Sequence, residues 1–347
     1  LEEGPSRPNE PISGDRIRAS QRQFTVKKPI PMLCFAAMKG VILAAGKGSR
    51  LYPITHHIAK PLLPLANRPT LHYAIDRLKE MGISEVCVVV GENEPQMREA
   101  LNDGSALGVA ISYVRQTDPH GLAHAVGFAK DFVGEDSFCL YLGDAIYSES
   151  LAPFAEKFKS SGCANLNLVK WVEDPSRFGV ANLEGERIVK LVEKPKEPES
   201  NYAMAGMYIF GPQIWSVLPT LQPSARGEYE ITDAIQMMID QGEQVVAGVY
   251  KGEWFDTGTL NSFLDTSGHL IDGKSIVADN AHVTAAVGHS VVIGDGAHVS
   301  CDSIEDSVVL PGAHVSVRGH VRHSILAGRV ESSESIEDQI RWNDSTQ

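Results

Sequence analysis

The chain contains few cysteines, few aromatic residues and no long apolar run, and it carries more acid than base. Its five cysteines are widely spaced and form no Cys-x-x-Cys pair, which argues against a disulfide framework and a zinc site and favours reduced thiols in the cytoplasm. No stretch approaches the ~18 consecutive apolar residues of a membrane-spanning helix, so we expect no membrane partner. The formal charge of −13 would repel a polyanion, so we also expect no nucleic-acid partner.

The 347 residues correspond to about two domains. Residues 1–37 are rich in Pro, Ser, Arg and Glu without helix or strand periodicity, which predicts a disordered or non-native leader before Met38. After it, apolar strand-like runs alternate with segments of helical spacing, and such alternation predicts crossover units in an α/β fold. We therefore expect a Rossmann-like, mostly parallel sheet in a catalytic domain over residues 38–270. The expected strands are 40–43, 86–90, 111–114, 138–142 and 166–172, and the expected helices are 71–81, 96–101, 121–132 and 151–158.

The pattern changes after about Ile271, where a short repeat begins. Ala-His-Val recurs with a period of 16 at Ala281, Ala297 and Ala313. Short β-branched steps between Gly, Asp and Asn predict the hexapeptide rungs of a parallel β-helix over residues 271–330, followed by a flexible tail over 331–347. The period places His282, His298 and His314 in one column, which favours a structural face of the β-helix over a tetrahedral metal site.

A glycine-rich loop follows the first expected strand. The strand Val41-Ile42-Leu43 runs into Ala44-Ala45-Gly46-Lys47-Gly48-Ser49-Arg50. Gly46 and Gly48 allow backbone N–H groups to close on phosphate oxygens, and Arg50 adds a planar fork of donors. The loop matches neither the Rossmann nor the Walker pattern, so by itself it fits a tight turn as well as a phosphate site.

Further residues extend this loop into a longer signature. Pro53, Thr55 and Lys60-Pro61 complete the spacing Gly-x-Gly-x-Arg-Leu-x-Pro-x-Thr-x4-Lys-Pro. The chain thereby resembles the sugar-1-phosphate nucleotidyltransferases, and its last three matching blocks are most similar to glucose-1-phosphate thymidylyltransferases. The resemblance covers about residues 38–270, and the β-helix resembles the left-handed appendage of the long form of such enzymes. The downstream blocks are Gln116 with 121–125, Gly143-Asp144, 178–180, 193–195, 200–208, 223–233 and 254–259.

The resemblance implies attack by a sugar-1-phosphate oxygen on the α-phosphorus of dTTP or UTP, with release of pyrophosphate and formation of dTDP-glucose or UDP-glucose. The nucleophile is already ionised, because the second pKa of a phosphate monoester is near ~6. The chemical task is therefore to neutralise charge with a metal, cationic side chains and backbone donors. The family implies Mg²⁺ as the cofactor, held by Asp144 and Asp256.

The same resemblance assigns roles to other residues. Arg50 and Lys60 would face the triphosphate, and Lys194 the sugar phosphate. The nucleotide-binding set is Ala45, Gly46, Gly48, Gln116 and Gly121. The sugar-binding set is Gly179, Glu193, Lys194 and Arg226.

Structural alternatives exist for several of these residues. Asp144 follows the run 138–142, at the edge where open α/β sheets bind ligands, but it and Asp256 would also serve as loop caps. Lys194 and Glu193 would also fit a solvated pair, and Gln116 an ordinary loop residue. Arg226 would equally pair with an acid that positions the following helix.

Alternatives also remain for the activity as a whole. The Ala145 after Asp144, where thymidylyltransferases usually carry Asn, weakens the assignment of thymidine over uridine. A uridylyltransferase for another sugar 1-phosphate and a non-catalytic sugar-nucleotide-sensing subunit are the alternative functions. The apolar coils of the β-helix lead us to expect a homo-oligomer.

Overall fold

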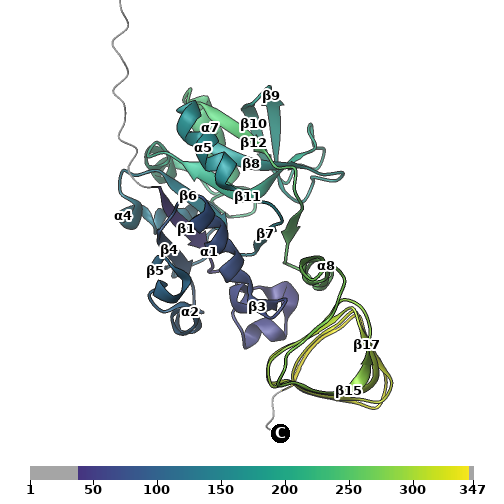
Figure 1. The fold of residues 1–347 in the computed structure, drawn as a ribbon. Coiled ribbons are helices and arrows are strands. Elements are labelled where there is room, and N and C mark those ends of the chain that lie inside the picture. The colour runs from purple at the N-terminus through teal and green to yellow at the C-terminus, as the bar shows by residue number, and fades with distance from the viewer. Residues whose placement is uncertain (1–37, 344–347) are drawn as a thin grey trace, which may run out of the picture. The chain divides into compact units, whose positions relative to one another are not determined.

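The computed structural model describes residues 38–343 (Figure 1), all within one compact unit of the chain. The expected leader, residues 1–37, lies outside the described residues. Within the described part, no helix is both long and apolar enough to cross a bilayer.

A mixed nine-stranded sheet forms the centre of the first domain, in the order β5-β4-β1-β6-β11-β8-β12-β10-β9. Strands β5, β4, β1 and β6 are mutually parallel, whereas β11 is antiparallel to both of its neighbours β6 and β8. The α/β expectation is confirmed, although parallel pairing covers only part of the sheet. The strands are β1 Lys39–Leu43, β4 Glu85–Val90, β5 Ala110–Arg115, β6 Phe138–Leu142, β8 Asn165–Trp171, β9 Gly179–Glu184, β10 Arg187–Glu193, β11 Tyr202–Phe210 and β12 Val245–Val249.

Helices pack on this sheet, and two small antiparallel pairs, β2–β3 and β7–β13, lie beside it. The α-helices are α1 Thr70–Glu80, α2 Glu94–Leu101, α3 Leu122–Gly127, α4 Lys130–Val133, α5 Ala152–Ser161, α6 Ile214–Val217, α7 Ile231–Asp240 and α8 Leu260–Leu270. The 3-10 turns are η1 Ser49–Leu51, η2 Ile54–His56, η3 Lys60–Leu62, η4 Ser105–Leu107 and η5 Leu218–Thr220. The short strands are β2 Pro64–Leu65, β3 Arg68–Pro69, β7 Ala145–Tyr147 and β13 Trp254–Asp256.

The register of the parallel strands brings two functional segments together. Leu43, the last residue of β1, pairs with Leu142, the last residue of β6. The backbone N–H of Gly143 donates to the carbonyl of Leu43 over 3.0 Å. The glycine-rich loop after β1 and Asp144 after β6 therefore leave the sheet side by side, at the edge where such folds bind ligands.

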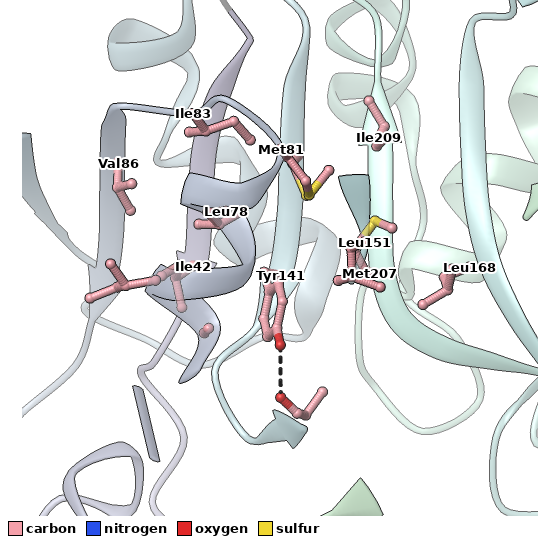
Figure 2. Packing of buried hydrophobic residues seen from close by; sticks show 14 of the residues in the cluster. Ile42, Leu78, Met81, Ile83, Val86, Tyr141, Leu151, Leu168, Met207 and Ile209 are labelled. Atoms are coloured by element: carbon pink, nitrogen blue, oxygen red, sulfur yellow. Dashed lines mark hydrogen bonds between the residues drawn. The ribbon is translucent and has the colours of Figure 1, made fainter. Parts of the chain in front are cut away.

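The apolar core under α1 also fixes this edge. Leu78 of α1 and Met81, the residue after this helix, pack over Ile42 of β1 and Tyr141 of β6 (Figure 2). The buried hydroxyl of Tyr141 donates to the carbonyl of Ala145 over 3.0 Å, as the dashed line in Figure 2 marks. Because that carbonyl lies directly after Asp144, the core holds the turn that carries this carboxylate.

The C-terminal region winds into stacked coils, seen end-on as a triangle in Figure 1. Every strand pair in it is parallel, which fits a β-helix. The expected period is visible in the register, because His282 pairs with His298 and His298 with His314. The strands are β14 Ile276–Val277, β15 His282–Val287, β16 Val291–Ile293, β17 His298–Glu305, β18 Ser307–Val309, β19 His314–Val317, β20 His320–Arg322, β21 Ile325–Ser332, β22 Ile336–Glu337 and β23 Ile340–Asn343.

The flexible tail expected over residues 331–347 is wrong as far as Asn343. Strand β22 pairs with β20, and β23 pairs with β21. Ile336 is fully buried, so these residues add to the β-helix stack. The polar run Glu331-Ser332-Ser333-Glu334 gave no sign of this, because it comprises the end of β21 and the bend after it, and most of its side chains are exposed.

One face of the β-helix packs on the first domain. Val291 and Ile293 point into the β-helix, whereas Val292 between them joins a second apolar cluster. This cluster, here called the joint core, unites side chains from 3-10 turns after the glycine-rich loop, from α8 and from the coils. Its buried members are Leu51, Ile54, Leu63, Leu65, Ile146, Phe263, Leu264, Ile271, Val292, Val308, Leu310, Ile325 and Ala327.

Candidate active site

The glycine-rich loop is held open by contacts with its neighbours. Gly48 has a left-handed backbone (φ 64°), and a Cβ there would lie 2.9 Å from the Cβ of Lys60. The Thr55 hydroxyl donates to the carbonyl of Gly48 over 2.8 Å, and Asn93 Nδ2 donates to the carbonyl of Ala44 over 2.8 Å. With these carbonyls engaged, the loop's N–H groups are the polar groups left to meet an anion.

Two cavities of about 330 and 430 Å³ meet at this loop. Both are lined by Ala45, Gly46, Lys60, Gln116 and Pro119. The smaller one also has the apolar side chains of Leu43, Leu122, Ala125 and Leu142 along its wall, with Asp144 at its margin. A slot with an apolar wall and a charged end fits a nucleotide, whose base is flat and whose phosphates are anionic.

Gly121 closes the apolar wall against the segment before α7. Its φ is +107°, and a Cβ there would lie 2.6 Å from the carbonyl oxygen of Tyr229. Tyr229 donates its N–H to the carbonyl of His120 over 2.7 Å, and its own carbonyl accepts from Ala123 N–H over 3.0 Å. The wall therefore depends on the absence of a side chain at Gly121.

We expect Gly121→Ala to raise the KM for the nucleotide at least ~10-fold, because the strained backbone and the clash with Tyr229 cost ~1–3 kcal/mol. Gly127→Ala is the matched control, since Gly127 ends the same helix and a Cβ there would meet nothing within 4 Å. The control should keep the wild-type KM and melt at the same temperature or slightly higher. Steady-state kinetics of both variants decide the matter, and equal KM values would contradict this role for Gly121.

Two carboxylates and a lysine meet at the charged end. Lys60 is 9% exposed, and its Nζ lies 2.5 Å from Asp144 Oδ2. Asp256 ends β13 and pairs across to Ala145, while Thr257 donates its N–H and its hydroxyl to the carbonyl of Asp144, over 3.3 and 3.0 Å. Burial, and then the nearby Asp144 charge, raises the pKa of Asp256, with Lys60, Arg50 and Arg177 opposing.

Arg50 lies beside this pair. A Cβ on Gly258 would lie 2.4 Å from Arg50 Nη2 and 2.9 Å from Asp256 Oδ1, so the guanidinium and the carboxylate flank the same glycine. A larger residue at Gly258 would separate them. Two cations, Arg50 and Lys60, thus lie next to two carboxylates, Asp144 and Asp256, beside the glycine-rich loop.

This pair of carboxylates fits a hard divalent cation. Burial is the main cause of the raised pKa of Asp256 and repulsion by Asp144 adds to it, and a cation between the two carboxylates would relieve that repulsion. Among residues 38–343, no group of three or more His, Cys, Asp or Glu side chains is placed to hold a metal. A cation here would therefore take its remaining ligands from substrate phosphates and water, as Mg²⁺ commonly does.

The sugar-binding set forms a second cluster around Glu193, at the end of β10. Glu193 Oε2 accepts from the Thr232 hydroxyl over 3.0 Å, and Oε1 accepts from Arg226 Nη1 over 3.2 Å. Lys194 Nζ lies 3.2 Å from the same Oε1. Glu193 pairs with Gly179 across β9, where a Cβ would lie 2.5 Å from Thr232 Cγ2.

Arg226 links this cluster to the cavities. It pairs with Glu193 at 3.2 Å and with Glu228 at 2.8 Å, and Glu228 lines the smaller cavity. Its third partner is Glu230, at 3.7 Å, which immediately precedes α7, so Arg226 also contacts the start of the following helix. Burial raises the pKa of Asp233, with the Glu193 charge adding to it.

The nucleotide and metal sets predicted from sequence gather in one place. Ala45, Gly46, Lys60, Gln116, Gly121 and Asp144 line one cavity, Gly48 contacts Lys60, and Arg50 adjoins Asp256. The sequence reasoning missed Thr232, Thr257 and Glu228 as contacts of these groups. Their signal was available, because Glu228 and Thr232 lie in the 223–233 block and Thr257 in the 254–259 block.

The histidine column on the β-helix is a row of neighbouring rings. Neighbouring ring centroids of His282, His298 and His314 lie 4.7 and 4.6 Å apart. The rings of His298 and His314 are nearly parallel, at 7°, and those of His282 and His298 are tilted by 36°. Among the described residues, no group of three such side chains is placed to hold a metal.

Comparisons with known proteins agree with this geometry. The nucleotidyl transferase family profile matches residues 39–273. The chain is 43% identical over 257 residues, 72% of both chains, to the low-salt glycan biosynthesis nucleotidyltransferase Agl11 of Haloferax volcanii. It is 37% identical over 266 residues, 71% of this chain and 75% of the relative, to a glucose-1-phosphate thymidylyltransferase of Streptomyces antibioticus.

Solved structures show the same similarity. A candidate glucose-1-phosphate thymidylyltransferase from Bacillus anthracis, in complex with a sucrose, matches with a TM-score of 0.64 and 38% identity over 68% of this chain and 96% of that one. A UDP-glucose pyrophosphorylase complexed with UDP-glucose matches with a TM-score of 0.63 and 27% identity over 68% of this chain and 99% of that one. With the family profile matching more than half of its length, the chain belongs to the nucleotidyl transferase family.

Proposed function

We propose that this protein transfers a nucleoside monophosphate from dTTP or UTP to glucose 1-phosphate, giving dTDP-glucose or UDP-glucose and pyrophosphate. A sugar-phosphate oxygen forms the new bond to the α-phosphorus, and the bond from that phosphorus to the bridging oxygen of the β-phosphate breaks. The observation that carries the proposal is the meeting of Lys60, Asp144 and Asp256 at the glycine-rich loop.

The residues present would serve this reaction through charge. Lys60 and Arg50 would balance the triphosphate, with Lys60 almost fully buried and therefore fixed in place. Loop N–H groups around Gly46 and Gly48 would bind phosphate oxygens, and the apolar wall with Gln116 and Gly121 would hold the base. Groups held in position in this way would lower the barrier without reorganising during the reaction.

The Glu193 cluster would hold the sugar 1-phosphate. Glu193 is well placed to accept from a sugar hydroxyl, and Arg226 and Lys194 supply cations beside it, with ion-pair distances of 3.2 Å each. Gly179, across the strand pair from Glu193, leaves the room that this cluster needs.

We propose Mg²⁺ as the cofactor, held by Asp144 and Asp256. When bound, it would neutralise charge on the phosphates and on the leaving pyrophosphate. The support is chemical: hard oxygen ligands, two carboxylates and a partly buried site suit this ion.

The proposal extends to the setting of the enzyme. Cys87, Cys139, Cys163 and Cys301 are free thiols, in keeping with a reducing compartment, and we propose a cytoplasmic location. We also propose a homo-oligomer, because the exposed β-helix face around the histidine column remains open for a second copy.

Pyrophosphate release tests the activity directly. We expect release with dTTP or UTP together with glucose 1-phosphate and a divalent cation, and no release when either substrate is omitted. A panel of nucleotides and sugar 1-phosphates identifies the preferred pair. No release with any pair would overturn the proposed activity.

A further inference from the structure

A histidine lies directly behind the one buried amide of the nucleotide cavity. Gln116 follows β5, is 6% exposed, and donates its backbone N–H to the carbonyl of Val90 over 2.8 Å. Its side-chain Nε2 lies 3.1 Å from Nδ1 of His124, on α3. His124 therefore contacts the side chain that faces the cavity while lying on the other side of it, in a separate cavity of about 440 Å³.

The contact between Gln116 and His124 determines which imidazole nitrogen carries the proton. An amide NH₂ group only donates, so Nδ1 of His124 must accept, and the imidazole proton sits on Nε2. With one N–H of Gln116 Nε2 directed at His124, the amide is held in one orientation, with Oε1 on the side away from the imidazole and available to the cavity that Gln116 lines. An acceptor oxygen opposite N3 of the base accepts the ring N–H of thymine or uracil and faces a lone pair in cytosine.

We propose that His124 is a positioning residue that holds the Gln116 amide with its carbonyl toward the base, and so selects nucleotides whose base presents a ring N–H. This inference rests on the proposed nucleotidyl transfer. It adds His124, which lies outside the nucleotide cavity, as a residue that determines which base is bound. Protonation of His124 would remove the selection, because an imidazolium donates at Nδ1 and attracts the amide oxygen instead.

The surroundings of His124 keep it neutral at neutral pH. The charged or titratable groups around it are Asp118 and His120 from the loop before α3, Tyr229 from the segment before α7, and Lys130 of α4. Burial lowers the pKa of His124 below its ordinary value of 6.5, with repulsion by His120 adding to this and Asp118 opposing it. The acceptor form therefore predominates at neutral pH, and the donor form appears only as the pH falls below 6.5.

Three neighbouring aromatic rings fix the orientation of the His124 imidazole. Its centroid lies 5.2 Å from that of His120 and 5.1 Å from that of Phe128, both edge-to-face, and 6.2 Å from that of Tyr229. An imidazole fixed on three sides presents Nδ1 in one direction, which a positioning residue requires.

The test compares dTTP with 5-methyl-dCTP, which differ only at N3 and C4 of the base. The ratio of their kcat/KM values cancels the titration of the sugar phosphate, the triphosphate and the metal site. For the wild-type enzyme at pH 8 we expect a ratio well above one, falling as the pH is lowered below 6.5.

Two substitutions separate positioning from packing. His124→Phe keeps an aromatic ring but cannot accept, so the ratio should fall about tenfold at pH 8 and no longer change with pH. His124→Asn offers a side-chain oxygen to Gln116 Nε2, so it should restore the ratio and keep it constant at low pH. Melting temperatures of the three proteins show that all are folded.

The outcomes are distinct. A ratio in His124→Phe equal to that of the wild type at pH 8, in an active enzyme, would overturn the role of His124. A wild-type enzyme that releases no pyrophosphate with any nucleotide would instead overturn the proposed function.

Discussion

Asp144→Asn and Asp256→Asn are each expected to lower turnover by at least ~10²-fold, the scale of losing one preorganised charge at a reacting phosphate. The two side chains lie at the glycine-rich loop, and Asp144 contacts Lys60 at 2.5 Å. Asparagine keeps the size of each side chain and removes its charge. The loss should therefore appear in turnover at saturating nucleotide and sugar phosphate.

The two variants should differ in stability. The pKa of Asp256 is raised by burial and by repulsion from Asp144, so removing its charge relieves an unfavourable interaction and should leave the Tm unchanged or higher without metal. Asp144→Asn removes the partner of Lys60, a 9% exposed cation, and should lower the Tm. If Asp256→Asn loses activity without a lower Tm, its loss of activity is not a consequence of lost stability, and the carboxylate serves the reaction.

Asp265→Asn is the matched control, because Asp265 is an exposed residue of α8 and the same charge is lost nine residues after Asp256. It should retain wild-type turnover. Turnover within a few-fold of wild type in both site variants, measured at saturating Mg²⁺, would show that neither carboxylate holds the cation.

The nucleotide side of the site was accessible to sequence reasoning because its residues cluster along the chain. Gly46, Gly48, Arg50 and Lys60 lie within fifteen residues, and parallel β1 and β6 bring Asp144 to the same edge. The contact of His124 with Gln116 was not accessible. It depends on the turn of α3 after a glycine with φ +107°, which no pattern of residue types specifies.

In the β-helix, too, some features could be predicted from the sequence and others could not. Its period predicted the column of histidines, since residues separated by one coil stack directly. The outward face of β16, β18 and β21 carries Val292, Val308 and Ile325. From sequence we would expect Val308 and Ile325 in the interior stack of the coils. Only the structure shows that they point away from the interior, into the joint core.

Ending the chain at Leu270, and so removing the β-helix, is expected to lower the Tm by many degrees. The joint core would lose Val292, Leu310 and Ile325, each at most 2% exposed, and would expose Leu51 and Ile54 of the first domain. Exposing one such side chain costs ~1.5–3 kcal/mol, so several together approach the ~5–15 kcal/mol by which a typical domain is stable.

The loss should extend to nucleotide binding. The segment that the β-helix covers begins beside Arg50 and contains Lys60. It is also held by the stacking of His57 on Trp342, with centroids 4.3 Å apart, and by Asn67 Nδ2 donating to the carbonyl of Ile293 over 3.1 Å. Without these contacts, the segment that contains Arg50 and Lys60 would be less well fixed, and the KM for the nucleotide should rise.

A point substitution isolates this coupling in the full-length chain. Leu310→Asp puts a charge into the joint core, where Leu310 is 1% exposed, and should lower the Tm and raise the KM for the nucleotide. Ala286→Asp adds the same charge at an exposed position of β15 outside the cavity around the histidine column, and should change neither. If Leu310→Asp melts and binds nucleotide as the control does, the β-helix does not support the segment that carries Arg50 and Lys60. A lower Tm with an unchanged KM would mean that the β-helix stabilises the protein but does not position Arg50 and Lys60 for nucleotide binding.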